Sequence, residues 1–228
     1  YTPEPVVEFI VRSVDEVLQS EFGLKQGLAD SEKTQFRYDT GRRIGKKRKI
    51  DYEIGDFHRV QILDPAAGTG TFLAEAVKQI SAKIQKSNPG AWHSYVEENL
   101  IPRMHGFELL MAPYALCHMK LDLLLHDSGF RPNQDPERLS VYLTNSLEGP
   151  GSGEMDLLAF FDEWLAEEAR GANEIKRKLP IMCIIGNPPY LGESKNKDPF
   201  IMNVMEDYKK EPNSGEKLKE KNSKWIKD

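Results

Sequence analysis

Short apolar runs alternate with longer stretches of helical periodicity through most of the chain, and this alternation restricts the possible folds more than any other feature. The four runs are RVQIL (59–63), RMHGFEL (103–109), LSVYLTNSL (139–147) and IMCII (181–185). A strand that returns to its sheet through a helix lies parallel to the strand before it. The sequence therefore predicts an α/β fold with a doubly wound, mostly parallel sheet.

The helices expected between these runs follow from their periodicity. One helix follows the segment DPAAGTGTF and ends at about Lys86, a second covers 111–125 and a third covers 155–177. Another is expected near the start of the chain, over residues 5–19. Its predicted buried face consists of Val6, Val7, Ile10, Val14 and Val17. The last 20 residues, from Lys209, are charged and broken by Gly, Pro and Asn, and we expect a loop or a frayed helix.

Residues 36–53 alternate in polarity and contain Gly41 and Gly45, which predicts a hairpin. A solvated hairpin tip is the preferred interpretation of its basic residues, and a phosphate-contacting patch is the alternative. The basic cluster consists of Arg42, Arg43, Lys46, Lys47, Arg48 and Lys49.

Composition narrows the class of protein. The 228 residues are 39% hydrophobic and 29% charged, and no apolar run approaches the roughly 20 residues that span a bilayer. Cys117 and Cys183 lie in separate apolar segments, so we expect reduced core thiols and a cytoplasmic protein. The five histidines are scattered, and no metal site is expected. The net charge of −5 argues mildly against DNA binding by this chain alone.

The segment DPAAGTGTF, from Asp64 to Phe72, joins the first run to its helix. Gly68 and Gly70 allow a tight turn and the close approach of a ligand. The segment differs from the dinucleotide fingerprint because no third glycine follows at the required spacing. Asp64 would repel a pyrophosphate, so the segment suits a ligand that carries an amine.

Polar residues end the next two runs. Glu108 is placed to bind ribose hydroxyls, or it caps the following helix. Asn145 either reads an adenine edge or is a turn residue. Together with Asp64, these residues indicate a nucleoside ligand with an amine and without phosphate, and S-adenosylmethionine fits that description.

The fourth run ends in GNPPY, residues 186–190. An exocyclic amine such as N6 of adenine is a poor nucleophile because its lone pair is delocalised into the ring. The side-chain oxygen of Asn187 and the carbonyl of Pro188 could accept its two N–H groups, while Pro188 and Pro189 hold the backbone still. Tyr190 could stack on a base that has left the duplex. A plain strand-ending turn is the alternative.

These motifs together resemble those of N6-adenine DNA methyltransferases. DPAAGTGTF is similar to the family's cofactor motif, NPPY to its catalytic motif, and YTPEPVVEFI to the helix that closes over the cofactor. The order of the motifs, which is cofactor helix, glycine motif and then catalytic motif, is the gamma arrangement. The residues of these segments most resemble those of methyltransferase domains in large single-chain restriction-modification enzymes. The resemblance implies catalytic roles for Asn187, Pro188, Pro189 and Tyr190. It implies S-adenosylmethionine binding by Thr2, Asp64, Ala66, Gly68, Gly70, Phe72, Glu108 and Asn145.

The resemblance also implies an incomplete domain. The family's sheet has seven strands and we count four, so we expect a piece of a longer protein with one partial methyltransferase domain. Its expected parts are a cofactor-closing helix and hairpin (1–58), a cofactor-binding and catalytic core (59–190) and a polar tail (191–228). The implied partners are double-stranded DNA with a flipped adenine and the remaining domains of the parent chain, with no membrane.

Two other functions remain open. Protein glutamine N5-methyltransferases also use NPPY, because an amide nitrogen poses the same lone-pair problem. The N-terminal cofactor helix and the residues of DPAAGTGTF argue against a glutamine methyltransferase. The chain could also be a cofactor-binding fragment without turnover of its own.

Overall fold

The computed structural model describes residues 2–45, 49–132, 138–147, 149, 163–189, 199–211 and 214–218. Its helices are α1 (Glu4–Ser20), α2 (Thr71–Ser87), α3 (Trp92–Tyr95), α4 (Met111–Asp127), α5 (Glu163–Lys178) and α6 (Pro199–Tyr208). Its strands are β1 (Lys33–Ile44), β2 (Lys49–His58), β3 (Ile62–Asp64), β4 (Met104–Glu108), β5 (Ser140–Leu143) and β6 (Cys183–Ile184). Short 3₁₀ turns lie at Gly27–Ala29, Pro89–Ala91 and Ile101–Arg103, and a π turn lies at Val96–Leu100.

Four strands form the central sheet in the order β5-β4-β3-β6, and each neighbouring pair is parallel. The predicted doubly wound parallel sheet is therefore confirmed, and each predicted run contributes one strand. The chain moves outward from β3 through β4 to β5, and then returns to pair β6 with the other edge of β3. The strand order thus reverses at β3, and ligands bind at such a reversal in open α/β sheets.

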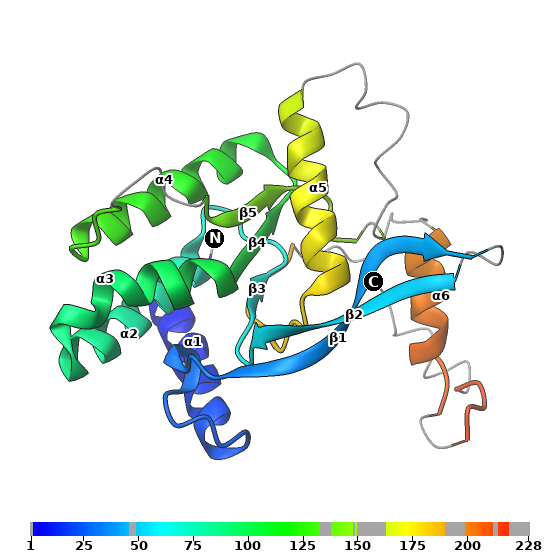
Figure 1. Ribbon diagram of the computed structural model, residues 1–228, viewed down its shortest axis with the longest axis horizontal. Helices are drawn as coiled ribbons and strands as arrows, with labels where there is room; N and C mark the ends of the chain where they lie inside the picture. Colours follow the sequence, from blue (N-terminus) through cyan, green and yellow to red (C-terminus); the bar gives the residue numbers. More distant parts are fainter. Residues whose placement is uncertain are drawn as a thin grey trace.

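Side chains that alternate along the strands bury both faces of the sheet. Ile62 and Met104 face the larger core, which contains residues of α1, α2 and α4. Leu63 and Phe107 point the other way and pack against α5. Figure 1 shows α5 apart from the helices that cover the opposite face. Cys117 and Cys183 are both buried and free, as expected for core thiols.

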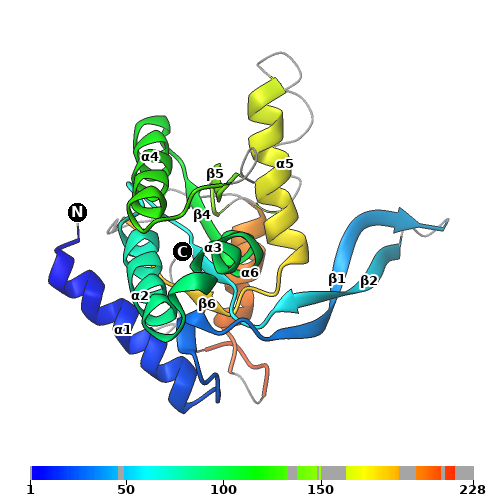
Figure 2. The ribbon, with the colours of Figure 1, turned by 60° about the vertical axis from the view of Figure 1, so that its left-hand side comes forward.

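The β1–β2 hairpin is antiparallel and extends away from the sheet (Figure 2). It is longer at both ends than the predicted 36–53. Arg43 lies 3.2 Å from Asp39, and Arg42 lies 3.9 Å from Glu53. Acidic neighbours therefore pair with part of the basic cluster, which favours the solvated-tip interpretation for these two arginines. Residues 46–48 of the cluster lie outside the described residues.

Helix α1 packs on α2, but the predicted buried face was partly wrong. Val7 and Val11 are fully buried, whereas Val6 and Val17 are 45% and 47% exposed. Val11 and Leu18 extend the Val7 row along the helix, so the true stripe is rotated away from Val6 and Val17. An ion pair of 2.7 Å between Lys83 and Asp15 holds α1 to α2 on its polar side.

Two helices in the second half differ from expectation. The described part of the helix predicted at 155–177 begins at Glu163 and ends at Lys178, and residues 155–162 lie outside the described ranges. Helix α6, at Pro199–Tyr208, was not predicted, and Lys209 to Lys210 continue from it as a turn and an isolated bridge. Within the described part of the chain, no helix is long and apolar enough to cross a bilayer.

Candidate functional site

The candidate site lies at the carboxyl edge of the sheet, where β3, β4 and β5 end and the chain leaves β6. Because parallel strands end at the same edge, residues far apart in sequence meet there. Asp64 and Glu108 end β3 and β4, and Asn145 follows β5. Asn187 follows β6, which pairs directly with β3. The runs RVQIL and IMCII therefore form neighbouring strands.

The glycine segment folds tightly against the end of β4. The amide of Ala67 donates to the carbonyl of Phe107 at 2.8 Å. Gly68 and Gly70 have positive φ angles of 56° and 73°. A Cβ on Gly70 would lie 2.6 Å from the sulfur of Cys117, so both the conformation and the space require glycine there. Helix α2 begins directly after this turn.

Asp64 is the most unusual carboxylate of the site. Its side chain is 1% exposed, and Oδ1 accepts a hydrogen bond of 3.1 Å from the amide of Ala66. Oδ2 is buried and has no partner among the described residues. Burial raises the pKa of Asp64 to about 7, and the negative charge of Glu108 adds to the rise. A buried, unpaired carboxylate oxygen is costly, and a cationic donor would relieve that cost.

Glu108 joins the glycine segment to helix α4. Oε2 accepts from the amide of Gly68 at 2.8 Å, and Oε1 accepts from the amide of Leu110 at 2.8 Å. The bond to Leu110 agrees with the capping interpretation, because that residue immediately precedes α4. Each carboxylate oxygen can accept a second hydrogen bond, so ribose binding is compatible with this arrangement.

Asn145 occupies a turn after β5. Its Oδ1 accepts a hydrogen bond of 3.0 Å from the amide of Leu147, and its carbonyl accepts one of 2.8 Å from Lys176. The adjacent Thr144 amide donates to the carbonyl of Glu108 at 2.8 Å. Asn145 therefore has the turn role that the sequence left open, close to Glu108, and its contact with a base stays a prediction.

The corner after β6 contacts the segment that precedes α1. Asn187 is half-buried, and its Nδ2 donates to Oγ1 of Thr2 at 2.9 Å. Pro188 and Pro189 are exposed, and Tyr190 lies outside the described residues. The stacking role of Tyr190 therefore stays a prediction, and Asn187 lies at the carboxyl edge of the sheet with Asp64 and Glu108.

Gly186 is a site residue that the sequence interpretation missed. A Cβ on Gly186 would lie 2.6 Å from Oδ1 of the buried Asp64. The corner can approach the end of β3 this closely because residue 186 has no side chain. Its position directly before Asn187 was the available signal.

We expect Gly186→Ala to separate the corner from Asp64. Overpacking of this kind costs roughly 1–3 kcal/mol, so the free energy of unfolding measured in urea should fall by that amount. Gly90→Ala is the matched control, because its Cβ would make only an ordinary contact, 3.7 Å from Oδ1 of Asn88. Equal stability of the two variants would show that the corner has room to move.

Apolar side chains directly after Glu108 were also missed. Leu109 and Leu110 are 65% and 61% exposed, although large apolar side chains usually avoid such exposure. They directly follow Glu108, so an apolar surface lies beside this carboxylate. The signal was two consecutive leucines at the end of a strand.

A cleft of about 250 Å³ lies between the start of α1 and helices α2 and α4. Thr2, Thr69, Thr71 and Lys120 contribute polar groups to its lining, and Nζ of Lys120 lies 3.4 Å from Oγ1 of Thr71. Thr2 thus lines this cleft and also contacts Asn187. Of the predicted cofactor residues, Thr2 is the one that lines it.

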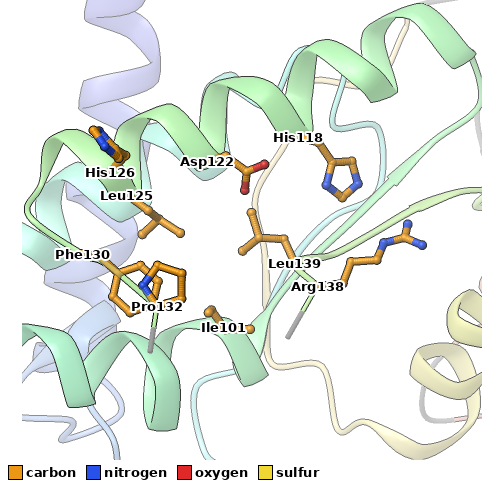
Figure 3. Close-up of a pocket in the computed structure, with 9 residues that line it drawn as sticks. All are labelled: Ile101, His118, Asp122, Leu125, His126, Phe130, Pro132, Arg138 and Leu139. Carbon is orange, nitrogen blue, oxygen red and sulfur yellow. The ribbon is translucent and has the colours of Figure 1, made fainter. Parts of the chain in front are cut away.

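A second cavity, of about 320 Å³, lies beside α4 and the start of β5 (Figure 3). None of the predicted site residues lines it. Its Arg138 is held by an ion pair of 2.5 Å with Glu168 and donates to Oη of Tyr114 at 2.7 Å. This larger cavity is therefore separate from the candidate site.

Comparisons with known proteins agree with this geometry. Residues 49–227 match the protein family described as N-6 DNA Methylase. No curated protein sequence matches the chain.

Solved structures with a similar fold include a nuclease-deletion mutant of the Type ISP restriction-modification enzyme LlaGI in complex with a DNA substrate mimic. That structure has a TM-score of 0.63 and 22% identity, and the match covers 94% of this chain and 15% of LlaGI. The ATP-dependent Type ISP restriction-modification enzyme LlaBIII bound to DNA has a TM-score of 0.59 and 22% identity over 92% of this chain and 12% of LlaBIII. A DrdV–DNA complex has a TM-score of 0.51 and 25% identity over 86% of this chain and 14% of that chain. The chain thus spans a small part of the length of each.

Proposed function

Because the chain belongs to the N-6 DNA methylase family, we propose that it transfers a methyl group from S-adenosylmethionine to the N6 amine of adenine in DNA, as part of a restriction-modification enzyme. One observation carries the proposal. The Asn-Pro-Pro corner follows the strand that pairs with β3 across the strand-order reversal, and Gly186, directly before it, lies against Asp64 of the glycine segment. The acceptor for the target amine and the cofactor site then lie together at the carboxyl edge of the sheet.

The residues at this edge fit the proposed cofactor. The orphaned Oδ2 of Asp64 suits the ammonium of the methionine end, and Glu108 suits the ribose hydroxyls. Leu109 and Leu110 offer an apolar surface to the adenine ring. Ala66, Gly68, Gly70 and Phe72 would lie along the cofactor. The cofactor supplies an electrophilic methyl group on a sulfonium centre.

The protein's own part of the reaction is to hold the target amine. Oδ1 of Asn187 accepts one N–H and the carbonyl of Pro188 accepts the other, which favours a nitrogen whose lone pair points at the methyl group. These fixed dipoles stabilise the positive charge that develops on nitrogen. Alignment of the two reacting groups supplies most of the remaining rate enhancement. Tyr190 would stack on the flipped base.

The proposed partners are double-stranded DNA and further domains of a longer parent chain, in the cytoplasm. Similar folds occur in the DNA complexes of LlaGI, LlaBIII and DrdV, whose chains are much longer than this one. We propose one partial methyltransferase domain, with residues 1–58 closing over the cofactor, 59–190 forming the core and 191–228 leading to further strands.

A methylation assay on the full-length parent protein tests the function. Tritiated methyl groups should enter mixed-sequence DNA, and digestion should recover the label as N6-methyladenine. Label in a glutamine-bearing release-factor-like protein, and none in DNA, would instead identify a glutamine methyltransferase. Cofactor binding without transfer to either would identify a binding module.

Loss of Glu108 should weaken cofactor binding specifically. We expect Glu108→Ala to leave ribose donors and two backbone amides without their acceptor, at a cost of about 1–3 kcal/mol in binding free energy. Calorimetric titration with S-adenosylmethionine measures the change, and the exposed Glu98→Ala is the control. Unchanged affinity in Glu108→Ala would remove the ribose assignment.

A further inference from the structure

The hydrogen bond between Thr2 and Asn187 joins the start of the described chain to the catalytic corner. Nδ2 of Asn187 is the donor and Oγ1 of Thr2 is the acceptor, at 2.9 Å. Both side chains are half-buried, so water competes weakly for this bond.

Proline holds the backbone on each side of this bond. Thr2 immediately precedes Pro3, and Asn187 immediately precedes Pro188. The backbone of a residue before proline is restricted to extended conformations, so the backbone is held at both ends of this bond. Pro3 also begins α1, where its carbonyl accepts hydrogen bonds from the amides of Val6 and Val7. The buried Val7 and Val11 then fix that helix in the core.

The orientation of the Asn187 amide decides what it can bind. Its oxygen accepts hydrogen bonds and its nitrogen donates them, and the two ends have nearly the same shape. When the nitrogen donates to Thr2, the oxygen is the end left to accept an N–H from a target amine. In the opposite orientation the nitrogen would face the amine, and two donors would meet.

We propose, resting on the proposed function, that Thr2 is a positioning residue that holds the Asn187 side chain in place by this hydrogen bond and leaves its amide oxygen for the target amine. Thr2 acts through Asn187 and does not touch the reacting atoms in this role. The segment before α1 thereby contributes to methyl transfer itself, beyond closing over the cofactor.

Turnover by the parent enzyme, at saturating cofactor and DNA, tests the proposal. Thr2→Val keeps the shape and removes the acceptor, so kcat should fall about tenfold, as expected for the loss of one hydrogen bond in a part-buried site. Thr2→Ser should restore kcat to within about twofold of wild type, because its hydroxyl can accept the same bond. Ser13→Ala removes a hydroxyl of α1 that donates to the carbonyl of Phe9 and should leave kcat unchanged.

The Asn187→Ala background separates positioning from folding. Thr2 acts only through the Asn187 side chain, so Thr2→Val should change the residual kcat there by less than about twofold. The same tenfold loss in both backgrounds, or a wild-type kcat in Thr2→Val alone, would overturn the proposal. If the residual kcat of Asn187→Ala is too small to measure, the Thr2→Val and Thr2→Ser rates decide. A wild-type parent that binds cofactor but methylates no adenine would instead overturn the proposed function.

Discussion

Replacing Asn187 with alanine in the parent enzyme is expected to reduce adenine methylation by about 10²–10³-fold while cofactor affinity stays nearly unchanged. The reason is that Asn187 is assigned to the target amine, where its oxygen stabilises charge that develops in the transition state. Removal of one such preorganised acceptor costs rates of this order. The measurement is kcat at saturating S-adenosylmethionine and DNA, together with calorimetry of cofactor binding.

Asn187→Asp is the matched variant, because a carboxylate still accepts a hydrogen bond from the amine. It should keep part of the activity that Asn187→Ala loses. If Asn187→Ala methylates adenine at the wild-type rate, the corner after β6 is only a strand-ending turn.

Replacing Asp64 with asparagine is expected to have opposite effects on stability and binding. The buried carboxylate lacks a partner for Oδ2, so loss of its charge should raise the stability of the cofactor-free protein at neutral and alkaline pH. The same loss removes a charged partner of the cofactor's ammonium, which should weaken S-adenosylmethionine binding by roughly 10–150-fold.

The pH dependence of unfolding follows from the raised pKa of Asp64. Its pKa is about 7 in the folded protein and 3.8 in its ordinary state. The folded state therefore keeps a proton that the unfolded state has released, so this group lowers stability progressively as the pH rises from about 4 to about 7. Between these limits, the variant should gain roughly 2–4 kcal/mol in unfolding free energy relative to wild type.

Urea unfolding of both proteins at pH 5 and pH 8 measures this gain. Calorimetry in two buffers of different ionisation heat should also show proton release when cofactor binds the wild type near pH 6, since the ammonium favours ionised Asp64. A constant difference in stability across the pH range, with no proton release, would contradict the assignment of Asp64 as the cofactor's ammonium partner.

The sheet could be predicted from the sequence because each strand is a local apolar run and each connection a local periodic stretch. The details that failed depend on tertiary packing. Val6 and Val17 belong to an apolar sequence pattern, but the core buries only the stripe of α1 that contains Val7 and Val11. The strand β3 begins at Ile62, three residues after the start of the predicted run, and ends at Asp64.

The candidate site was only partly predictable for a related reason. Asp64, Glu108 and Asn187 were found because each ends a strand with a polar side chain in a recognisable motif. The contact between Asn187 and Thr2 joins two residues that are 185 positions apart, and no local pattern reports such a contact. The need for glycine at position 186 likewise arises from Asp64, which lies on another strand.

The pairing of β6 with β3 has a consequence for the order in which the protein folds. Ile62 pairs with Cys183, and β4 and β5 lie between them in the sequence. Closing so long a loop is entropically unfavourable and slow, so local helices and the nearer strand pairs should form first. During synthesis, one edge of β3 stays unpaired until most of the chain has left the ribosome. Asn187 then reaches Thr2 among the last contacts of the core, so the glycine segment and Glu108 should be in place before the Asn-Pro-Pro corner joins them.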